Sequence, residues 1–149
     1  MVTLRVPLIA RLRQAFPEIV TGVKDSGGDW DHTQALLKDH SDLIILIGDE
    51  RHLAQGVRMG GQGAISGVAN FAPQEVGAMA NEGRDDPRVV ELVVELLKHP
   101  VTPAVKAMLA RELGDPKWLA VRAPLLSIST ETQNQLGIVF DRLFRSKAA

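Results

Sequence analysis

The residue with the clearest chemical potential is a lysine that ends a short apolar segment. Lys24 follows EIVTGV at residues 18–23 and precedes DSGGD, which is a turn-forming sequence. Because side chains alternate along a strand, Lys24 should share a face with Val20 and Gly22 and point into a covered interior. A buried lysine loses its proton readily, and the neutral amine attacks carbonyl carbons. Lys24 is therefore a candidate nucleophile, although many lysines at strand ends simply extend into water.

Several other kinds of chemistry find no support in the chain. The sequence contains no cysteine, which excludes disulfides, thiolate metal sites and a cysteine nucleophile. The four histidines, at positions 32, 40, 52 and 99, lie at no metal-ligand spacing, and we interpret them as surface residues. Asp25, Asp29 and Asp31 form an acidic cluster that we interpret as solvated. No metal or other cofactor is therefore expected.

Two further segments superficially resemble known catalytic or nucleotide-binding motifs. Residues 60–63 (GGQG) precede an expected strand instead of opening a helix, so they do not form a phosphate-binding loop. Ser66 lies in the sequence AISGV, which lacks the Gly-x-Ser-x-Gly pattern of a nucleophile elbow. The sequence therefore supports neither a dinucleotide-binding protein nor a serine hydrolase of that kind.

Length and composition indicate one ordinary domain. The chain has 149 residues, 45% of them hydrophobic, and a formal net charge of −1. Its lysines and arginines are scattered, which argues against electrostatic binding of nucleic acid. No apolar stretch approaches a membrane span, and the first residues lack the pattern of a signal peptide. We therefore expect no nucleic-acid or membrane partner and a cytoplasmic location.

Three apolar segments predict the strands that would carry the lysine and its neighbours. They lie at residues 19–24, 43–48 and 63–68. The middle segment contains five consecutive apolar residues, which is typical of a strand covered on both faces in a parallel sheet. Helices are expected between the strands, at residues 29–38 and 51–59. This alternation predicts repeated β/α units with parallel strands in chain order.

The remainder of the chain is expected to be helical. Residues 87–99, 103–113 and 130–145 carry apolar side chains at helical spacing. No linker or low-complexity tract separates these helices from the preceding part. We therefore predict a single domain over residues 1–149, with β/α units at 1–85 and a C-terminal helical part at 86–149.

Five segments together resemble one protein family. Residues 22–29 (GVKDSGGD) look like the Schiff-base lysine strand of the dihydrodipicolinate synthase / N-acetylneuraminate lyase family. Residues 47–50 (IGDE) and 63–70 (GAISGVAN) are similar to the ends of its next two strands. Residues 103–109 (PAVKAML) and 121–125 (VRAPL) are similar to helical segments that follow. The segments stand in family order and span almost the whole chain.

The resemblance implies only part of a barrel. The family is a (β/α)8 TIM barrel with extra C-terminal helices, and such barrels usually need about 250 residues. The chain resembles its C-terminal half, which contains parallel strands six, seven and eight and the helical tail. The family's glycine-rich turn for the substrate carboxylate and its proton-shuttling tyrosine on strand five have no counterpart, and the sequence contains no tyrosine. The implied fold class is α/β, a partial (β/α)8 barrel.

The resemblance also implies roles for residues at the ends of the second and third strands. Gly48, Asp49 and Glu50 would shape the pocket for a second substrate, whose hydroxyls Asp49 or Glu50 could bind. The alternative is that these carboxylates cap the following helix. The Ile65 carbonyl and the Ser66 hydroxyl would line the pyruvate pocket, and the alternative is tight strand packing.

Two kinds of function follow from these residues. The first is a Schiff-base (class I) lyase, aldolase or synthase in which Lys24 condenses with pyruvate or a 2-keto-3-deoxy acid, with an aldehyde as second substrate. Because the shuttle and the carboxylate-binding turn are missing, we expect this chain alone to be incomplete. The second is a non-catalytic fragment or oligomerisation module of a larger barrel. In both cases open sheet edges predict association with further copies or with a complementary barrel half.

Overall fold

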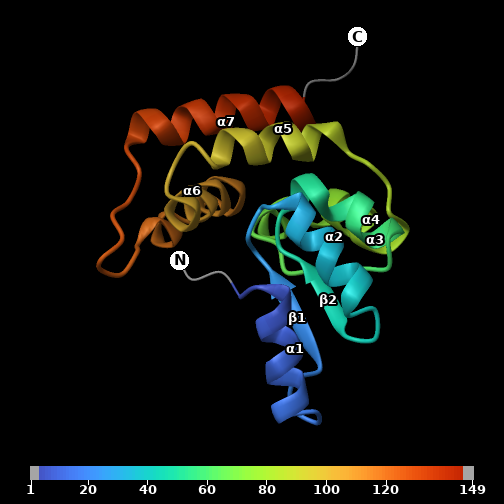
Figure 1. Cartoon of the computed structure of the whole chain (residues 1–149). Helices are drawn as coiled ribbons and strands as arrows, with labels where there is room; N and C mark the ends of the chain where they lie inside the picture. The colour runs from blue at the N-terminus through green and yellow to red at the C-terminus, as the bar shows by residue number, and fades with distance from the viewer. Residues whose placement is uncertain (1–3, 146–149) are drawn as a thin grey trace. The chain divides into compact units, whose positions relative to one another are not determined.

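The structure, a computed structural model, describes residues 4–145 (Figure 1). Two compact units divide the chain between them. The first unit contains the residues up to Ser66 together with Val76–Asp85. The second contains Gly67–Glu75 together with the residues from Asp86 onward. All six residues that the sequence analysis assigns to a site therefore belong to the first unit.

A three-stranded parallel sheet forms the centre of the first unit. Its strands are β1 (Gly22–Asp25), β2 (Ile44–Ile47) and β3 (Gly63–Ala64), in the order β1-β2-β3. Lys24 is paired with Leu46, which is in turn paired with Gly63. The predicted parallel arrangement in chain order is confirmed, but the strands are shorter than expected.

The first strand is short because a turn occupies the backbone before it. The N–H groups of Ile19 and Val20 both donate to the carbonyl of Phe16, and that of Thr21 donates to the carbonyl of Ile19. Groups used in these local hydrogen bonds cannot join a ladder with β2. The extended pairing therefore begins at Gly22 instead of Ile19.

Helices precede each strand or follow it, as the β/α pattern predicts. They are α1 (Val6–Ala15), α2 (Trp30–Asp39), the 3-10 helix η1 (Glu50–His52), α3 (Leu53–Arg58) and the part of α4 (Pro73–Glu82) from Val76 onward. Asp29 caps α2, because its carboxylate accepts hydrogen bonds from the N–H groups of Asp31 at 3.1 Å and His32 at 3.4 Å. Asp29 is exposed, as interpreted from the sequence, and it marks the start of the helix expected at residues 29–38.

Only one face of the sheet is covered by helices. Helices α2 and α3 both pack against β2, and Ile45 and Ile47 on that side are 1% and 2% exposed. On the opposite side Ile44 is 50% exposed, and Ile65 after β3 is 51% exposed. The prediction of a strand covered on both faces is therefore wrong for the described residues. We call the side that carries Ile44 and Ile65 the open face.

The second unit is helical. It contains η2 (Val68–Asn70), α5 (Pro87–Leu96), α6 (Val101–Leu113), η3 (Pro116–Leu119) and α7 (Thr130–Phe144). Helices α5 and α7 lie side by side (Figure 1). The Phe140 ring lies 6.0 Å from the Phe71 ring and 5.0 Å from the Phe144 ring. Other buried side chains in this unit are Val89, Leu92, Val93, Leu96, Ala104, Ala107, Met108 and Leu136.

The three C-terminal helices begin and end within a few residues of their predicted bounds. Pro87 and Pro103 both lie in the first turn of their helices, and Gly114 ends α6 with a positive φ of 64°. Within residues 4–145 no helix has the length and apolar character needed to cross a bilayer.

A close backbone contact joins the ends of β1 and β2. The N–H of Gly48 donates a hydrogen bond of 2.7 Å to the carbonyl oxygen of Asp25. A Cβ atom on residue 48 would lie 2.4 Å from that oxygen and 2.8 Å from the Ser26 hydroxyl oxygen. Only glycine therefore fits at this position without moving the turn that follows Lys24.

Gly48→Ala should destabilise the first unit, because the added methyl group must push the two strand ends apart. Steric overlap of this kind costs about 1–3 kcal/mol, which should lower the urea midpoint of unfolding. Gly77→Ala is the matched control: a Cβ there would lie 4.0 Å from the side-chain nitrogen of Asn81, an ordinary van der Waals contact, and α4 should gain about 0.5–1 kcal/mol. Equal midpoints for the two variants would contradict this account of Gly48.

Candidate active site

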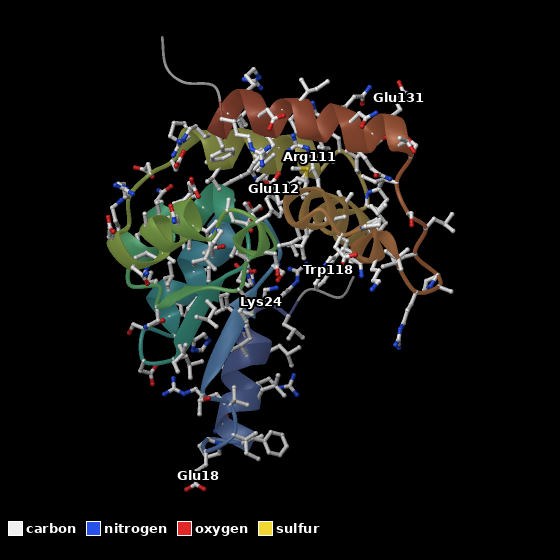
Figure 2. All side chains as sticks on the ribbon, turned by 180° about the vertical axis from the view of Figure 1, so that it is seen from behind. Glu18, Lys24, Arg111, Glu112, Trp118 and Glu131 are labelled. Atoms are coloured by element: carbon white, nitrogen blue, oxygen red, sulfur yellow. The ribbon has the colours of Figure 1, made fainter. Side chains whose placement is uncertain are left out.

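Lys24 lies at the carboxyl end of β1 and is exposed (Figure 2). The ladder pairs it with Leu46, and Gly22, two residues earlier, is also exposed. The predicted alternation along the strand is thus confirmed, but the expectation that Lys24 points into a covered interior is wrong for the described residues. The reason is that helices cover only the opposite face. Within residues 4–145 the Lys24 amine makes no hydrogen bond or ion pair.

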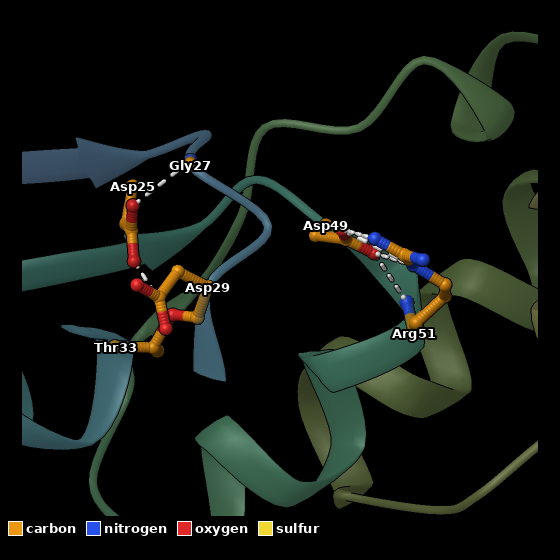
Figure 3. Close-up of polar contacts among 6 residues, drawn as sticks. All are labelled: Asp25, Gly27, Asp29, Thr33, Asp49 and Arg51. Atoms are coloured by element: carbon orange, nitrogen blue, oxygen red, sulfur yellow. Dashed lines mark hydrogen bonds and ion pairs between the residues drawn. The ribbon is translucent and has the colours of Figure 1, made fainter. Parts of the chain in front are cut away.

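Asp25, the next residue, lies on the covered face and is only 7% exposed. Its carboxyl group accepts hydrogen bonds from the Thr33 hydroxyl at 2.6 Å and from the Gly27 N–H at 3.1 Å (Figure 3). The interpretation of Asp25 as a solvated residue is therefore wrong, because strand alternation turns it inward. The surface interpretation is also wrong for His40, which is 5% exposed, with its Nε2 3.4 Å from the carbonyl oxygen of Val6.

Asp49 follows β2 and caps the short helix η1. Its carboxylate accepts a hydrogen bond of 3.0 Å from the N–H of Arg51. The Arg51 guanidinium also donates to both carboxylate oxygens, at 2.9 Å and 2.6 Å (Figure 3). Burial opposes ionisation of Asp49, but the hydrogen bonds and charge of Arg51 outweigh it, so its pKa lies below the usual value. The capping alternative is thus what the geometry supports for Asp49.

Glu50 and Ser66 meet although they end different strands. Glu50 is 7% exposed, and its Oε1 accepts a hydrogen bond of 2.5 Å from the Ser66 hydroxyl. Parallel strands bring their carboxyl ends to one edge of a sheet, so this meeting could have been expected once the strands were assigned. Sequence spacing alone does not reveal the pair. The neighbouring Ile65 exposes its side chain and donates its N–H to the carbonyl of Ile47 at 3.3 Å.

All six predicted residues therefore lie at the carboxyl edge of the sheet or directly after it. The edge offers one amine on the open face, and two carboxylates that already hold Arg51 and Ser66. Within the described part of the chain, no three His, Asp or Glu side chains gather to hold a metal ion.

A groove in the second unit has a volume of about 690 Å³. None of the predicted site residues lines it. Its walls come from α6, η3 and α7, with Arg111 and Asp141 joined by a 2.5 Å ion pair. The chemistry considered for the carboxyl edge of the sheet therefore does not depend on this groove.

Comparison with known proteins decides the family. The Dihydrodipicolinate synthetase family matches residues 1–142. The chain belongs to this family. An uncharacterized DapA-like lyase from Chloroflexus aurantiacus is 30% identical over 129 residues, which are 82% of this chain and 43% of the relative. The resemblance stated from the sequence is thus confirmed.

Solved members of the family share the fold of the chain. The crystal structure of dihydrodipicolinate synthase from Agrobacterium tumefaciens is 66% identical, with a TM-score of 0.94 over 97% of this chain and 50% of that one. The enzyme from Thermotoga maritima, at 22% identity, matches with a TM-score of 0.74 over 92% of this chain and 50% of that one, which supports the fold alone. The chain therefore spans about half the length of the relatives it matches.

The contact between Asp49 and Arg51 generates a prediction about pH. Asp49→Asn should lower the free energy of unfolding by about 1 kcal/mol near neutral pH, the usual effect of losing a cap. Because the folded pKa of Asp49 is depressed, its stabilisation is complete above the unfolded value of about 3.9 and is lost as pH falls through the folded pKa. The difference in free energy of unfolding between wild type and Asp49→Asn should therefore become smaller below about pH 4.

Urea unfolding of wild type and Asp49→Asn at a series of pH values measures this difference in free energy of unfolding. Asp39→Asn is the control, since Asp39 is exposed and makes no ion pair within residues 4–145, and its stability should change by less than about 0.5 kcal/mol at every pH. A gap that stays constant down to about pH 2 would contradict the assigned role of Arg51.

Proposed function

We propose that this chain is the Schiff-base half of a class I lyase or synthase acting on pyruvate or a related 2-keto acid. The supporting observation is Lys24 itself, at the carboxyl end of β1 on the side away from the helices. A carboxylate partner would favour the charged amine, and none is present within residues 4–145. Similarity to the Agrobacterium tumefaciens synthase also supports the proposal. It takes β1, β2 and β3 as strands six, seven and eight of a (β/α)8 barrel.

The proposed reaction begins when the neutral Lys24 amine attacks the 2-oxo carbon of pyruvate. The carbinolamine loses water to give an iminium, which withdraws electrons so that the adjacent carbon loses a proton and an enamine forms. This carbon then bonds to the carbonyl carbon of the aldehyde, whose oxygen takes up a proton. Water finally adds to the iminium and releases the product and the free amine.

The ends of β2 and β3 are proposed to bind the substrates. Ile65 offers its backbone carbonyl beside pyruvate, and Gly48 shapes the pocket by holding the turn that follows Lys24 in close contact with the end of β2. Asp49 already accepts four hydrogen bonds from Arg51, which fill the roughly four acceptor positions of a carboxylate. A hydroxyl of the second substrate would therefore have to replace one of these donors at Asp49, or bind Glu50 beside Ser66.

Efficient catalysis requires that another part of the barrel covers the open face. Dry surroundings raise the neutral fraction of a lysine amine, whereas Lys24, Ile44 and Ile65 are exposed here, so the chain alone should form the imine slowly. We propose that the remaining strands of the barrel cover this face and supply the carboxylate-binding turn and the proton shuttle. The remaining strands are the favoured cover because this chain matches 50% of the Agrobacterium tumefaciens protein and leaves the other half unmatched.

The exposed isoleucines also favour a second candidate function. Ile44 and Ile65 would suit a non-catalytic module that associates with another copy or with a complementary half. The two candidates differ in one respect that can be measured. Only the catalytic proposal requires a reactive amine at Lys24.

Borohydride trapping tests the nucleophile. Incubation of the chain with pyruvate and borohydride should reduce an imine at one position, and peptide mass analysis should locate the adduct on Lys24. Lys24→Arg should abolish the adduct, because a guanidinium does not form this imine. Lys38→Arg, which removes an exposed lysine of α2, should retain it. An adduct spread over many lysines, or none, would remove the proposal.

A second prediction concerns turnover by the chain alone. Positioned acid–base groups contribute about 10²–10⁴-fold to a rate, and substrate orientation contributes as much or more. Without the proposed shuttle and carboxylate-binding turn, the purified chain should trap imine but turn over no aldehyde in a panel assayed with pyruvate. Activity should appear when the unmatched half of the Agrobacterium tumefaciens synthase is added, and Lys24→Ala should abolish it. Multiple turnovers without the added half would show that the chain builds a complete site.

A further inference from the structure

A buried carboxyl group lies directly beside the proposed nucleophile in sequence but on the opposite face of the sheet. Asp25 is 7% exposed and is paired in the ladder with Ile47, which is 2% exposed. Lys24, one residue earlier, faces the open side. Because successive side chains of a strand point to opposite faces, the Asp25 carboxyl group cannot reach a substrate bound at Lys24. Any effect on the reaction must act through the backbone.

Asp25 links the end of β1 to three other parts of the first unit. Its side chain accepts hydrogen bonds from the Thr33 hydroxyl of α2 at 2.6 Å and from the Gly27 N–H of its own turn at 3.1 Å (Figure 3). His32 Nδ1 lies 3.5 Å from the same carboxyl group. The backbone carbonyl oxygen of Asp25 accepts the 2.7 Å hydrogen bond from the Gly48 N–H at the end of β2. The strand end that carries Lys24 is thus held from α2, from the turn and from β2.

Packing alone does not explain a carboxyl group in this place. The neighbouring buried positions on the same face, Ile45 and Ile47, are filled by apolar side chains. Burying a carboxyl group costs free energy that its hydrogen bonds only offset, so an apolar residue would serve packing at least as well. The carboxyl group instead fixes the orientation of the end of β1, since it accepts hydrogen bonds from two donors at defined positions. Lys24 needs such support because its own side chain has no partner within residues 4–145.

We propose that Asp25 is a positioning residue for the Schiff-base lysine. This inference rests on the proposed function of Lys24. Asp25 holds the end of β1 and the following turn, so that the Lys24 amine keeps one direction on the open face. A misplacement of about 1 Å at a reacting group can cost about 10²-fold in rate, so a modest shift of this strand end has a measurable effect.

The first test compares rates of imine formation per folded molecule. Asp25→Asn keeps the shape but leaves one acceptor oxygen for two donors, and the rate of borohydride-trapped imine at Lys24 should fall about 10-fold or more. Thr33→Val removes one donor and should also slow trapping, whereas Thr33→Ser keeps the hydroxyl and should retain most of the rate. The trapping rate of the double variant Asp25→Asn/Thr33→Val should be no lower than that of the slower single variant.

A matched control separates positioning from loss of stability. Asp86 caps α5 of the second unit in a similar way, accepting from the Arg88 N–H at 3.0 Å and from its guanidinium at 2.6 Å. Asp86→Asn should lower the urea midpoint as Asp25→Asn does, yet leave the trapping rate of the folded protein unchanged. Equal trapping rates for these two variants would overturn the proposal.

A second readout does not depend on imine formation. After reductive ¹³C-methylation, the Lys24 methyl signal in an NMR spectrum should shift or broaden in Asp25→Asn and stay in place in Asp86→Asn. If wild type forms no adduct with pyruvate, the function proposed for Lys24 fails, while a moved Lys24 signal still supports the structural role of Asp25. An unmoved signal in Asp25→Asn overturns the positioning role whether or not wild type forms an imine.

Discussion

The close contact between the ends of β1 and β2 is the constraint on which the candidate site depends. The Gly48 N–H reaches the Asp25 carbonyl at 2.7 Å, and no side chain fits at residue 48. The turn after β1 and the 3-10 helix after β2 both start from this contact. Lys24 lies just before this contact on β1 and Asp49 lies just after it on β2, so the separation of these two residues is set by backbone hydrogen bonding and not by flexible side chains. This rigidity is what a site built at strand ends requires.

The second property that matters is the difference between the two faces of the sheet. Ile45 and Ile47 are almost fully buried under helices, whereas Ile44 and Ile65 are about half exposed. Burial of an isoleucine side chain stabilises by roughly 1.5–3 kcal/mol, so the open face gains from being covered. The same cover would remove water from Lys24 and disfavour the charged form of an amine. Association through this surface would therefore also favour the neutral Lys24 amine.

Three carboxyl groups near the strand ends serve three different purposes. Asp25 faces the covered side and binds Thr33, Asp49 caps η1 and holds Arg51, and Glu50 accepts from Ser66. The residue types are nearly alike, and strand alternation and the position of the turns give each its surroundings. Similar acidic residues near the ends of parallel strands can thus support the backbone, fix an arginine or bind a serine that follows the neighbouring strand.

The sequence by itself determined the order of strands and helices, the candidate nucleophile and the family. Apolar runs, prolines and Gly114 act over a few neighbouring residues, so α5, α6 and α7 and the parallel strands could be predicted from local patterns. The motif around Lys24 is also local. Only the tertiary structure decided that Lys24 is exposed, that Asp25 is buried, and that Glu50 meets Ser66 across 16 positions. These features depend on which face the helices cover and which strand ends lie side by side, and such long-range contacts leave no periodic signal in the chain.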